Sequence, residues 1–324
     1  MFSLKINKDR LMVGAIVVVS MVGIFYFGIR TIRDHAKRNQ KNLDNYKQTN
    51  AELHHYSEVK KIPILFSVMR GITIDREDCL YVSGDGSYSK FSPEGHLQLT
   101  VSTGQTARCL AVDANGDVVL GLDDHIEVYT RAGKRKAQWD FLSDDAIITS
   151  IALTADHVFA ADAGNRIVWK LDKEGQPLGK IGEKNKSKDI PGFVIPSPYF
   201  DVVVDPDGFL WAVNSGRHSL ENYTVDGDLR ASWGHFSLEV DGFCGCCNPS
   251  HMAILEDGSF ITSEKGIPRV KQYNRLGDIV SVIAGPLQFR EGTVGLDLAV
   301  DSHQRIYVLD PPRGMVRIFE KNIN

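Results

Sequence analysis

Residues 201–208, with the sequence DVVVDPDG, decide the fold because their pattern recurs along the chain. A short apolar strand is followed by an acidic turn, and a second apolar strand comes next at residues 210–213. Self-similarity at a roughly constant interval is typical of repeat architectures. Six copies are present, starting at Gly71, Cys109, Ser150, Asp201, Met252 and Asp297.

A third landmark follows the acidic turn in each copy. It is a large apolar or aromatic residue, at Phe91, Tyr129, Leu171, Tyr223, Tyr273 and Phe319. In the first five copies a glycine stands four residues later, at Gly95, Gly133, Gly175, Gly227 and Gly277. A glycine there is typical of a tight turn between strands that needs a positive φ. Each copy therefore predicts four short strands.

A unit of four strands is too small to bury both faces, so such units stack radially into a closed ring. The sixth copy ends at Asn324 without a fourth strand, and residues 62–66 (IPILF) can supply it. The predicted fold class is all-β, a six-bladed β-propeller over residues 59–324 that is closed by its own first strand.

Two segments resemble a known repeat. Residues 162–168 (DAGNRIV) and 205–208 (DPDG) are similar to the NHL repeat, and the resemblance covers about residues 60–322. It implies a six-bladed propeller but leaves function open, because NHL-like propellers include scaffolds, ligand binders and a few metal-dependent enzymes.

Residues 11–29 are apolar and carry no charge, and Lys5, Lys8 and Arg10 precede them. At about 1.5 Å per residue a helix of this length nearly spans a bilayer core. We expect residues 1–29 to form an uncleaved N-terminal tail and transmembrane anchor; a cleaved signal and a buried helix are the alternatives.

The side of the membrane is less directly indicated by the sequence. Basic residues after the span outnumber those before it, which favours a cytoplasmic domain, whereas the short N-terminal tail favours export. We expect the propeller to be extracytoplasmic. Residues 30–58 are polar, without glycine or proline, and their broken heptad pattern predicts a helical stalk that pairs with another helix or serves as a solvated spacer.

The net charge of −4 and the pI near 6.2 give no basic face for nucleic acid. Nucleic acid is therefore not expected as a partner. From the apolar span and the fold, we expect the membrane and a protein bound through the propeller face or the stalk.

One long loop, residues 235–250, precedes the fifth copy and contains three of the five cysteines. Cys244, Cys246, Cys247 and His251 are the candidate metal ligands, because soft thiolates with an imidazole suit copper, zinc or an iron–sulfur cluster. A disulfide or redox-active thiol pair, and inert thiols, are the alternatives. Aligning the acidic turns predicts that His251 lies at the channel mouth, level with Arg70 and Arg108, and that Cys109 comes next on its own strand.

The second strands end in polar residues that would ring the same face. Glu264 and Asp310 are the strongest candidates for further channel-mouth ligands, since they flank the cysteine loop's blade or its neighbour. The alternative is structural, because short acidic side chains often accept backbone N–H groups in turns.

These observations favour a membrane-anchored binding or scaffold propeller with a metal or redox site at its mouth, within an electron-transfer assembly. A metal-dependent propeller enzyme, resembling lactonases or amidating lyases, is one alternative. Few histidines align at the mouth, which argues against an enzyme. A disulfide-stapled protein-docking module is the other alternative.

Overall fold

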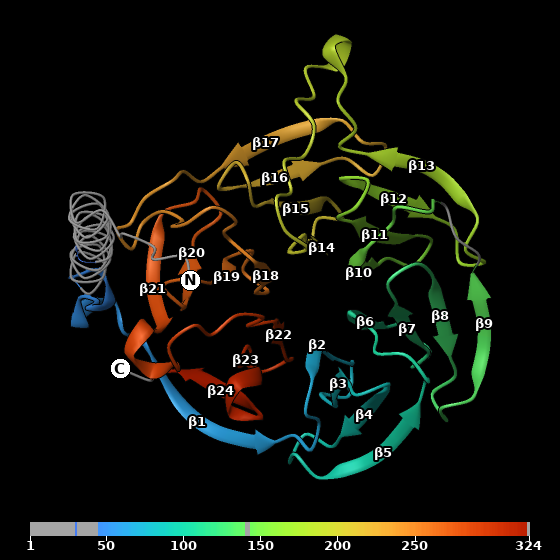
Figure 1. Cartoon of the computed structure of the whole chain (residues 1–324), viewed down its shortest axis with the longest axis horizontal. Coiled ribbons are helices and arrows are strands. Elements are labelled where there is room, and N and C mark those ends of the chain that lie inside the picture. The colour runs from blue at the N-terminus through green and yellow to red at the C-terminus, as the bar shows by residue number, and fades with distance from the viewer. Residues whose placement is uncertain (1–29, 31–44, 140–142, 323–324) are drawn as a thin grey trace, which may run out of the picture. The chain divides into compact units, whose positions relative to one another are not determined.

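Six antiparallel sheets of four strands stand around a central axis (Figure 1). The structure is a computed structural model that describes residue 30, residues 45–139 and residues 143–322. The described chain forms the six-bladed propeller that the repeat predicts. Residues 48–324 belong to one compact unit.

In chain order, the first four complete blades come after the strand that closes the ring. That strand is β1 Tyr56–Pro63. The blades are β2 Met69–Ile74, β3 Leu80–Gly84, β4 Ser87–Phe91 and β5 Leu97–Ser102; β6 Cys109–Val112, β7 Val118–Gly121, β8 Ile126–Tyr129 and β9 Arg135–Trp139; β10 Ile148–Leu153, β11 Val158–Asp162, β12 Ile167–Leu171 and β13 Pro177–Ile181; β14 Val202–Val204, β15 Leu210–Asn214, β16 Ser219–Tyr223 and β17 Leu229–Trp233.

The last two blades complete the ring. They are β18 His251–Ile254, β19 Phe260–Glu264, β20 Arg269–Tyr273 and β21 Ile279–Ala284; and β22 Leu298–Val300, β23 Ile306–Asp310, β24 Met315–Lys321 and β1.

The hydrophobic core lies between the blades. The buried apolar side chains form six clusters, and each cluster joins two neighbouring blades. The second and third strands of each blade are almost wholly buried, whereas the fourth strands β5, β9, β13 and β17 are largely exposed. This distribution explains the continuous apolar runs of the repeat, because a strand buried on both faces has no polar alternation.

The turn between the third and fourth strands is the same in five blades. Gly95, Gly133, Gly175, Gly227 and Gly277 all have φ between 80° and 88°. This left-handed conformation is costly for residues with a Cβ, so the regular glycine spacing in the sequence has a backbone cause.

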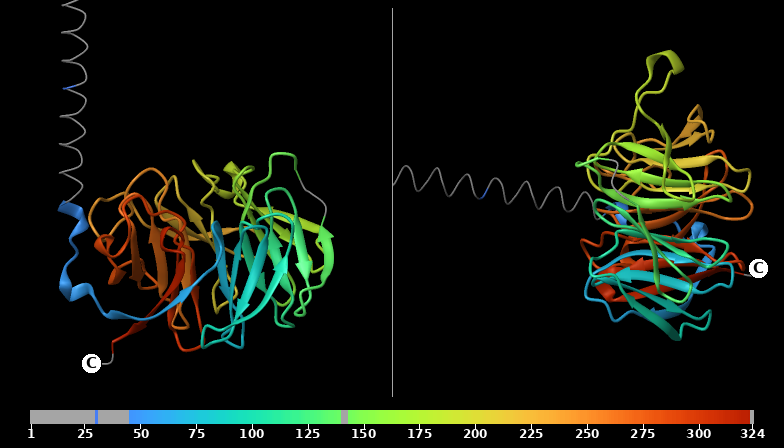
Figure 2. Two further views of the ribbon diagram at one scale, coloured as in Figure 1. Left: turned by 60° about the horizontal axis from the view of Figure 1, so that its bottom comes forward. Right: turned by 90° about the vertical axis from the view of Figure 1, so that its right-hand side faces the viewer.

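β1 closes the ring by pairing antiparallel with β24, from Tyr56 opposite Lys321 to Pro63 opposite Met315. Figure 2 shows the blue β1 beside the red C-terminal strand. The sequence predicts closure by an early strand, but the strand starts six residues earlier than the predicted residues 62–66. β1 lies at the outer rim, where half of its side chains face solvent, so its N-terminal part has no apolar signature.

Residues 45–58, at the end of the predicted stalk, do not form the continuous helix that the heptad pattern predicts, and residues 31–44 lie outside the residues described. Residues 45–58 contain two 3₁₀ turns, η1 Asn45–Lys47 and η2 Ala51–Leu53, and then enter β1. Within the described residues no helix is both long and apolar enough to cross a membrane. The predicted span at residues 11–29 lies outside the residues described.

Candidate functional site

The inner strands β2, β6, β10, β14, β18 and β22 surround a central cavity of about 240 Å³. The strand registers and the turns after them place one residue of each blade, in its inner strand or directly before it, at the same level. These six equivalent residues, here called the inner ring, are Gly71, Cys109, Ser150, Asp201, His251 and Asp297.

His251 lines the cavity, but not at the level predicted from the sequence. The alignment of acidic turns matched Glu256 with Asp205, whereas in the structure Leu255 has the hydrogen-bonded position of Asp205. His251 is therefore level with Cys109 and Asp201, not with Arg108. The glycine of the turn, Gly258, keeps its spacing from Leu255 and would have given the correct register.

Two carboxylates of the inner ring, Asp201 and Asp297, join neighbouring blades. Asp201 accepts the N–H of Met252 at 2.7 Å, and Asp297 accepts the N–H of Ile72 at 2.7 Å. Burial raises the pKa of Asp201 to about 6. Burial and then the charge of Asp201 raise the pKa of Asp297 to about 8. Neither residue is among the candidates from the sequence, although both directly precede an apolar inner strand.

The three cysteines of the long loop before β18 have different surroundings. Cys244 and Cys247 are buried, whereas Cys246 is exposed. The Sγ atoms of Cys246 and Cys247 are 3.2 Å apart and form a hydrogen bond. The structure thus brings together two of the four predicted ligands as a pair of neighbouring thiols.

Polar groups surround the Cys247 thiol. Burial acts to raise its pKa, but hydrogen bonds from Ser197 and Cys246 and the charge of Lys265 outweigh burial, so the pKa of Cys247 lies below its ordinary value. The hydrogen bond with Cys247 raises the pKa of Cys246. Cys247 is therefore the sulfur that carries the negative charge when the pair loses one proton.

Lys265 and Tyr199 connect the thiol pair with the cavity wall. The Lys265 ammonium donates to Ser197 Oγ at 2.9 Å and lies 4.1 Å from the centre of the Tyr199 ring. That ring meets the His251 imidazole edge-on, with ring centres 5.7 Å apart. Burial and the charge of Lys265 lower the pKa of His251 to about 4, so its imidazole is neutral at pH 7.

Glu264 is a buried residue that supports the cysteine loop, residues 235–250. Its carboxylate accepts the N–H of Cys244 at 3.0 Å and pairs with Arg269 at 2.8 Å and with Lys271 at 2.6 Å. Lys271 also donates to the carbonyl of Gly242 at 2.6 Å. Glu264 thus accepts a backbone N–H group, which is the structural role given above as the alternative to a channel-mouth ligand. Burial and Glu264 raise the pKa of Cys244 to about 11.

The other candidate channel-mouth residues are dispersed. Asp310 is fully buried and pairs with Arg313 at 2.9 Å and Arg317 at 3.5 Å, away from the cavity lining.

Arg70 and Arg108 both line the cavity, and Arg108 pairs with Asp123. Cys109 lines it too, but its side chain belongs to the apolar cluster between the second and third blades. Burial raises the pKa of Cys109.

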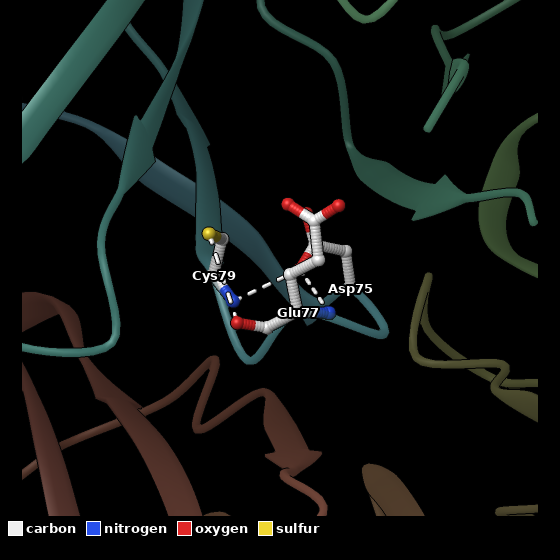
Figure 3. A group of neighbouring side chains, drawn as sticks. All are labelled: Asp75, Glu77 and Cys79. Atoms are coloured by element: carbon white, nitrogen blue, oxygen red, sulfur yellow. Dashed lines mark hydrogen bonds between the residues drawn. The ribbon is translucent and has the colours of Figure 1, made fainter. Parts of the chain in front are cut away.

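Among the described residues, three potential metal-ligating atoms lie within 4.8 Å of one another at Asp75, Glu77 and Cys79 (Figure 3). The cysteine loop and His251 do not form such a group. The Asp75 carboxylate accepts the N–H groups of Glu77 and Cys79 at 2.9 Å each and pairs with Lys90 at 3.1 Å. These contacts are those of a tight turn, so the group has a structural explanation.

No protein-family model matches the chain, and no curated protein matches it. Among solved structures, a streptogramin B lyase has a TM-score of 0.58 at 12% identity, covering 82% of this chain and 98% of its own. Virginiamycin B lyase from Staphylococcus aureus has a TM-score of 0.55 at 13% identity, covering 83% of this chain and 89% of its own. A protein of unknown function from Bacteroides thetaiotaomicron VPI-5482 has a TM-score of 0.58 at 16% identity, covering 82% of this chain and 72% of its own. At such identities the likeness shows the propeller fold alone.

Proposed function

We propose that this chain is a membrane-anchored binding propeller that holds a soft metal ion at its mouth through Cys246 and Cys247. The observation that carries the proposal is the 3.2 Å separation of the two sulfurs, one of them exposed. Anchoring through residues 11–29, an extracytoplasmic propeller and a protein partner belong to the same proposal.

The ligand set favours copper(I) among the three metals considered. A structural zinc ion usually takes four ligands, and the common iron–sulfur clusters take four cysteines. The Cys244 thiol is hydrogen-bonded to Glu264, and the His251 ring faces Tyr199. Among the described residues, neither forms a group of metal-ligating atoms with the pair. Copper(I) prefers soft thiolates, and the Cys247 sulfur is already biased towards the thiolate.

We do not propose catalysis from the structural similarity to the lyases. It is a likeness of fold, and function depends on the residues of the site. His251 lies on the cavity wall and is neutral. Among the described residues, it does not belong to any group of three potential metal ligands.

Anaerobic titration of the full chain with copper(I), in competition with a chromophoric chelator, tests the proposal. We expect one ion per chain, and a loss of affinity of at least about 100-fold in Cys246→Ser and in Cys247→Ser, since each removes a direct ligand. Cys79→Ser is the matched control, because Cys79 is a buried thiol in a turn outside the loop. Unchanged affinity in the loop variants, or an equal loss in the control, would contradict the proposal.

A further inference from the structure

Cys246 and Cys247 differ in a way that suits sequential chemistry. Both are free thiols in the structure. Cys246 is exposed and can meet a molecule from solvent, whereas Cys247 is 3% exposed and can react only with its neighbour. The 3.2 Å between their Sγ atoms leaves a short movement to bond formation.

We propose that Cys246 and Cys247 are a thiol–disulfide exchange site, which small soluble disulfides oxidise to a reversible bond between the two neighbouring residues. The exposed sulfur meets the incoming disulfide, and the buried sulfur completes the reaction. The observations behind this proposal are the unequal exposure of the two sulfurs and the 3.2 Å between them.

The reaction balances within the pair and the small disulfide RSSR. Cys246 loses its proton to solvent and its thiolate attacks one sulfur of RSSR, which gives a mixed disulfide on Cys246 and releases RS⁻. Cys247 gives its proton to that RS⁻, and its thiolate then attacks Cys246 Sγ, which forms the Cys246–Cys247 bond and releases the second RS⁻. The second RS⁻ takes up a proton from solvent, so two electrons pass from the protein to RSSR, which becomes two RSH.

Position makes Cys247 the resolving sulfur. The residue is 3% exposed, so an incoming disulfide meets the exposed Cys246 and not Cys247. The Cys247 Sγ lies 3.2 Å from Cys246 Sγ in the reduced chain. The second step is therefore intramolecular, and the Cys247 thiolate completes the exchange by attacking Cys246 Sγ.

The bond between neighbours should be easy to reduce again. Consecutive Cα atoms are about 3.8 Å apart, whereas disulfide-bonded residues usually have Cα atoms roughly 4.4–6.8 Å apart. A disulfide outside this range is strained, and strained or exposed disulfides are the labile ones. The pair therefore fits a reversible switch and not a permanent staple.

Oxidation would also close the copper site, and this second half of the inference rests on the proposed function. A disulfide offers no thiolate, so the oxidised chain loses both ligands at once. Copper(I) bound to the reduced pair would in turn protect the pair from small disulfides.

The test uses the full chain, reduced, freed of reductant and incubated with oxidised glutathione. After free thiols are alkylated, intact mass should show a loss of two hydrogens and no retained glutathione, and peptide mapping should place the bond between Cys246 and Cys247. Cys247→Ser should instead accumulate a mixed disulfide with one glutathione on Cys246. Cys246→Ser should remain unreacted in the loop, and Cys244→Ser should behave as the parent chain.

The outcomes distinguish the thiol–disulfide exchange site from the proposed copper(I) binding. A stable glutathione adduct on the parent chain, or a bond that involves Cys244, would overturn the exchange site even if copper(I) still binds. If the bond forms as expected but the reduced chain takes up no copper(I), the exchange site stands and the proposed function fails. If the oxidised chain keeps its copper(I) affinity, the link between the two is wrong.

Discussion

At the scale of single residues, the two carboxylates of the inner ring should make the protein's stability depend on pH. Asp297 has a folded-state pKa of about 8, against an ordinary value of 3.8. Between these values the folded chain binds the proton more tightly than the unfolded chain. The free energy of unfolding therefore falls as pH rises from about 4 to about 8, by at most about 1.4 kcal/mol per pH unit for one proton.

Asp297→Asn should flatten this decline, because the amide does not titrate and yet can accept the N–H of Ile72. Urea unfolding at a series of pH values between 4 and 8 measures the effect. Asp226→Asn, which changes an exposed carboxylate paired with Lys170, is the control and should keep the parent's slope. Equal slopes in Asp297→Asn and the parent would show that Asp297 is ionised throughout this range.

At the scale of elements, β1 is the strand on which the ring depends. It gives β24 a hydrogen-bonded neighbour, and its Glu58 binds the buried Arg317 through two hydrogen bonds of 2.9 and 3.0 Å. Without β1 the last blade would expose an open strand edge and leave Arg317 with only its longer contact to Asp310 among carboxylates. A single outer strand thus supports both the sheet and its buried charge.

Deleting residues 56–63 should abolish cooperative unfolding, because it removes ring closure and leaves a buried arginine poorly compensated. Loss of one partner from a buried ion pair alone costs about 3–5 kcal/mol. Urea unfolding followed by tryptophan fluorescence is the measurement. Lys61→Ser, an exposed change within β1, should leave the transition in place. A truncated chain that melts as sharply as the parent would mean that the ring closes without β1.

For the molecule as a whole, the proposed anchoring would let the side of the membrane set the redox conditions around the thiol pair. Stable disulfides persist in extracytoplasmic compartments, whereas the cytosol keeps thiols reduced. The proposed switch would be mostly oxidised in the first case and mostly reduced in the second. Under this proposal, the membrane topology bears directly on whether the proposed copper site is available.

An export-dependent reporter fused after Asn324 should be active, because the short N-terminal tail before residues 11–29 favours translocation of the chain on the C-terminal side of the span. The same fusion without residues 1–29 is the control and should be inactive. Activity of a cytoplasmic reporter at the same position, with an inactive export reporter, would place the propeller in the cytoplasm.

The number of blades and the order of their strands can be predicted from the sequence. Those features depend on local chemistry that repeats: an apolar strand, an acidic turn and a glycine with positive φ, as at Gly95 and Gly277. The sequence also locates the cysteine loop, since three cysteines within four residues are visible without a fold.

Which residues contact one another is visible only in the folded chain. Cys247 is buried and in contact with Ser197 and Lys265, which are distant in sequence, whereas the neighbouring Cys246 is exposed. Glu264 belongs to the loop's support and not to the mouth because Arg269 and Lys271 pair with it inside the blade. Burial and charge pairing depend on contacts between separate strands and loops, and local sequence patterns do not specify those contacts.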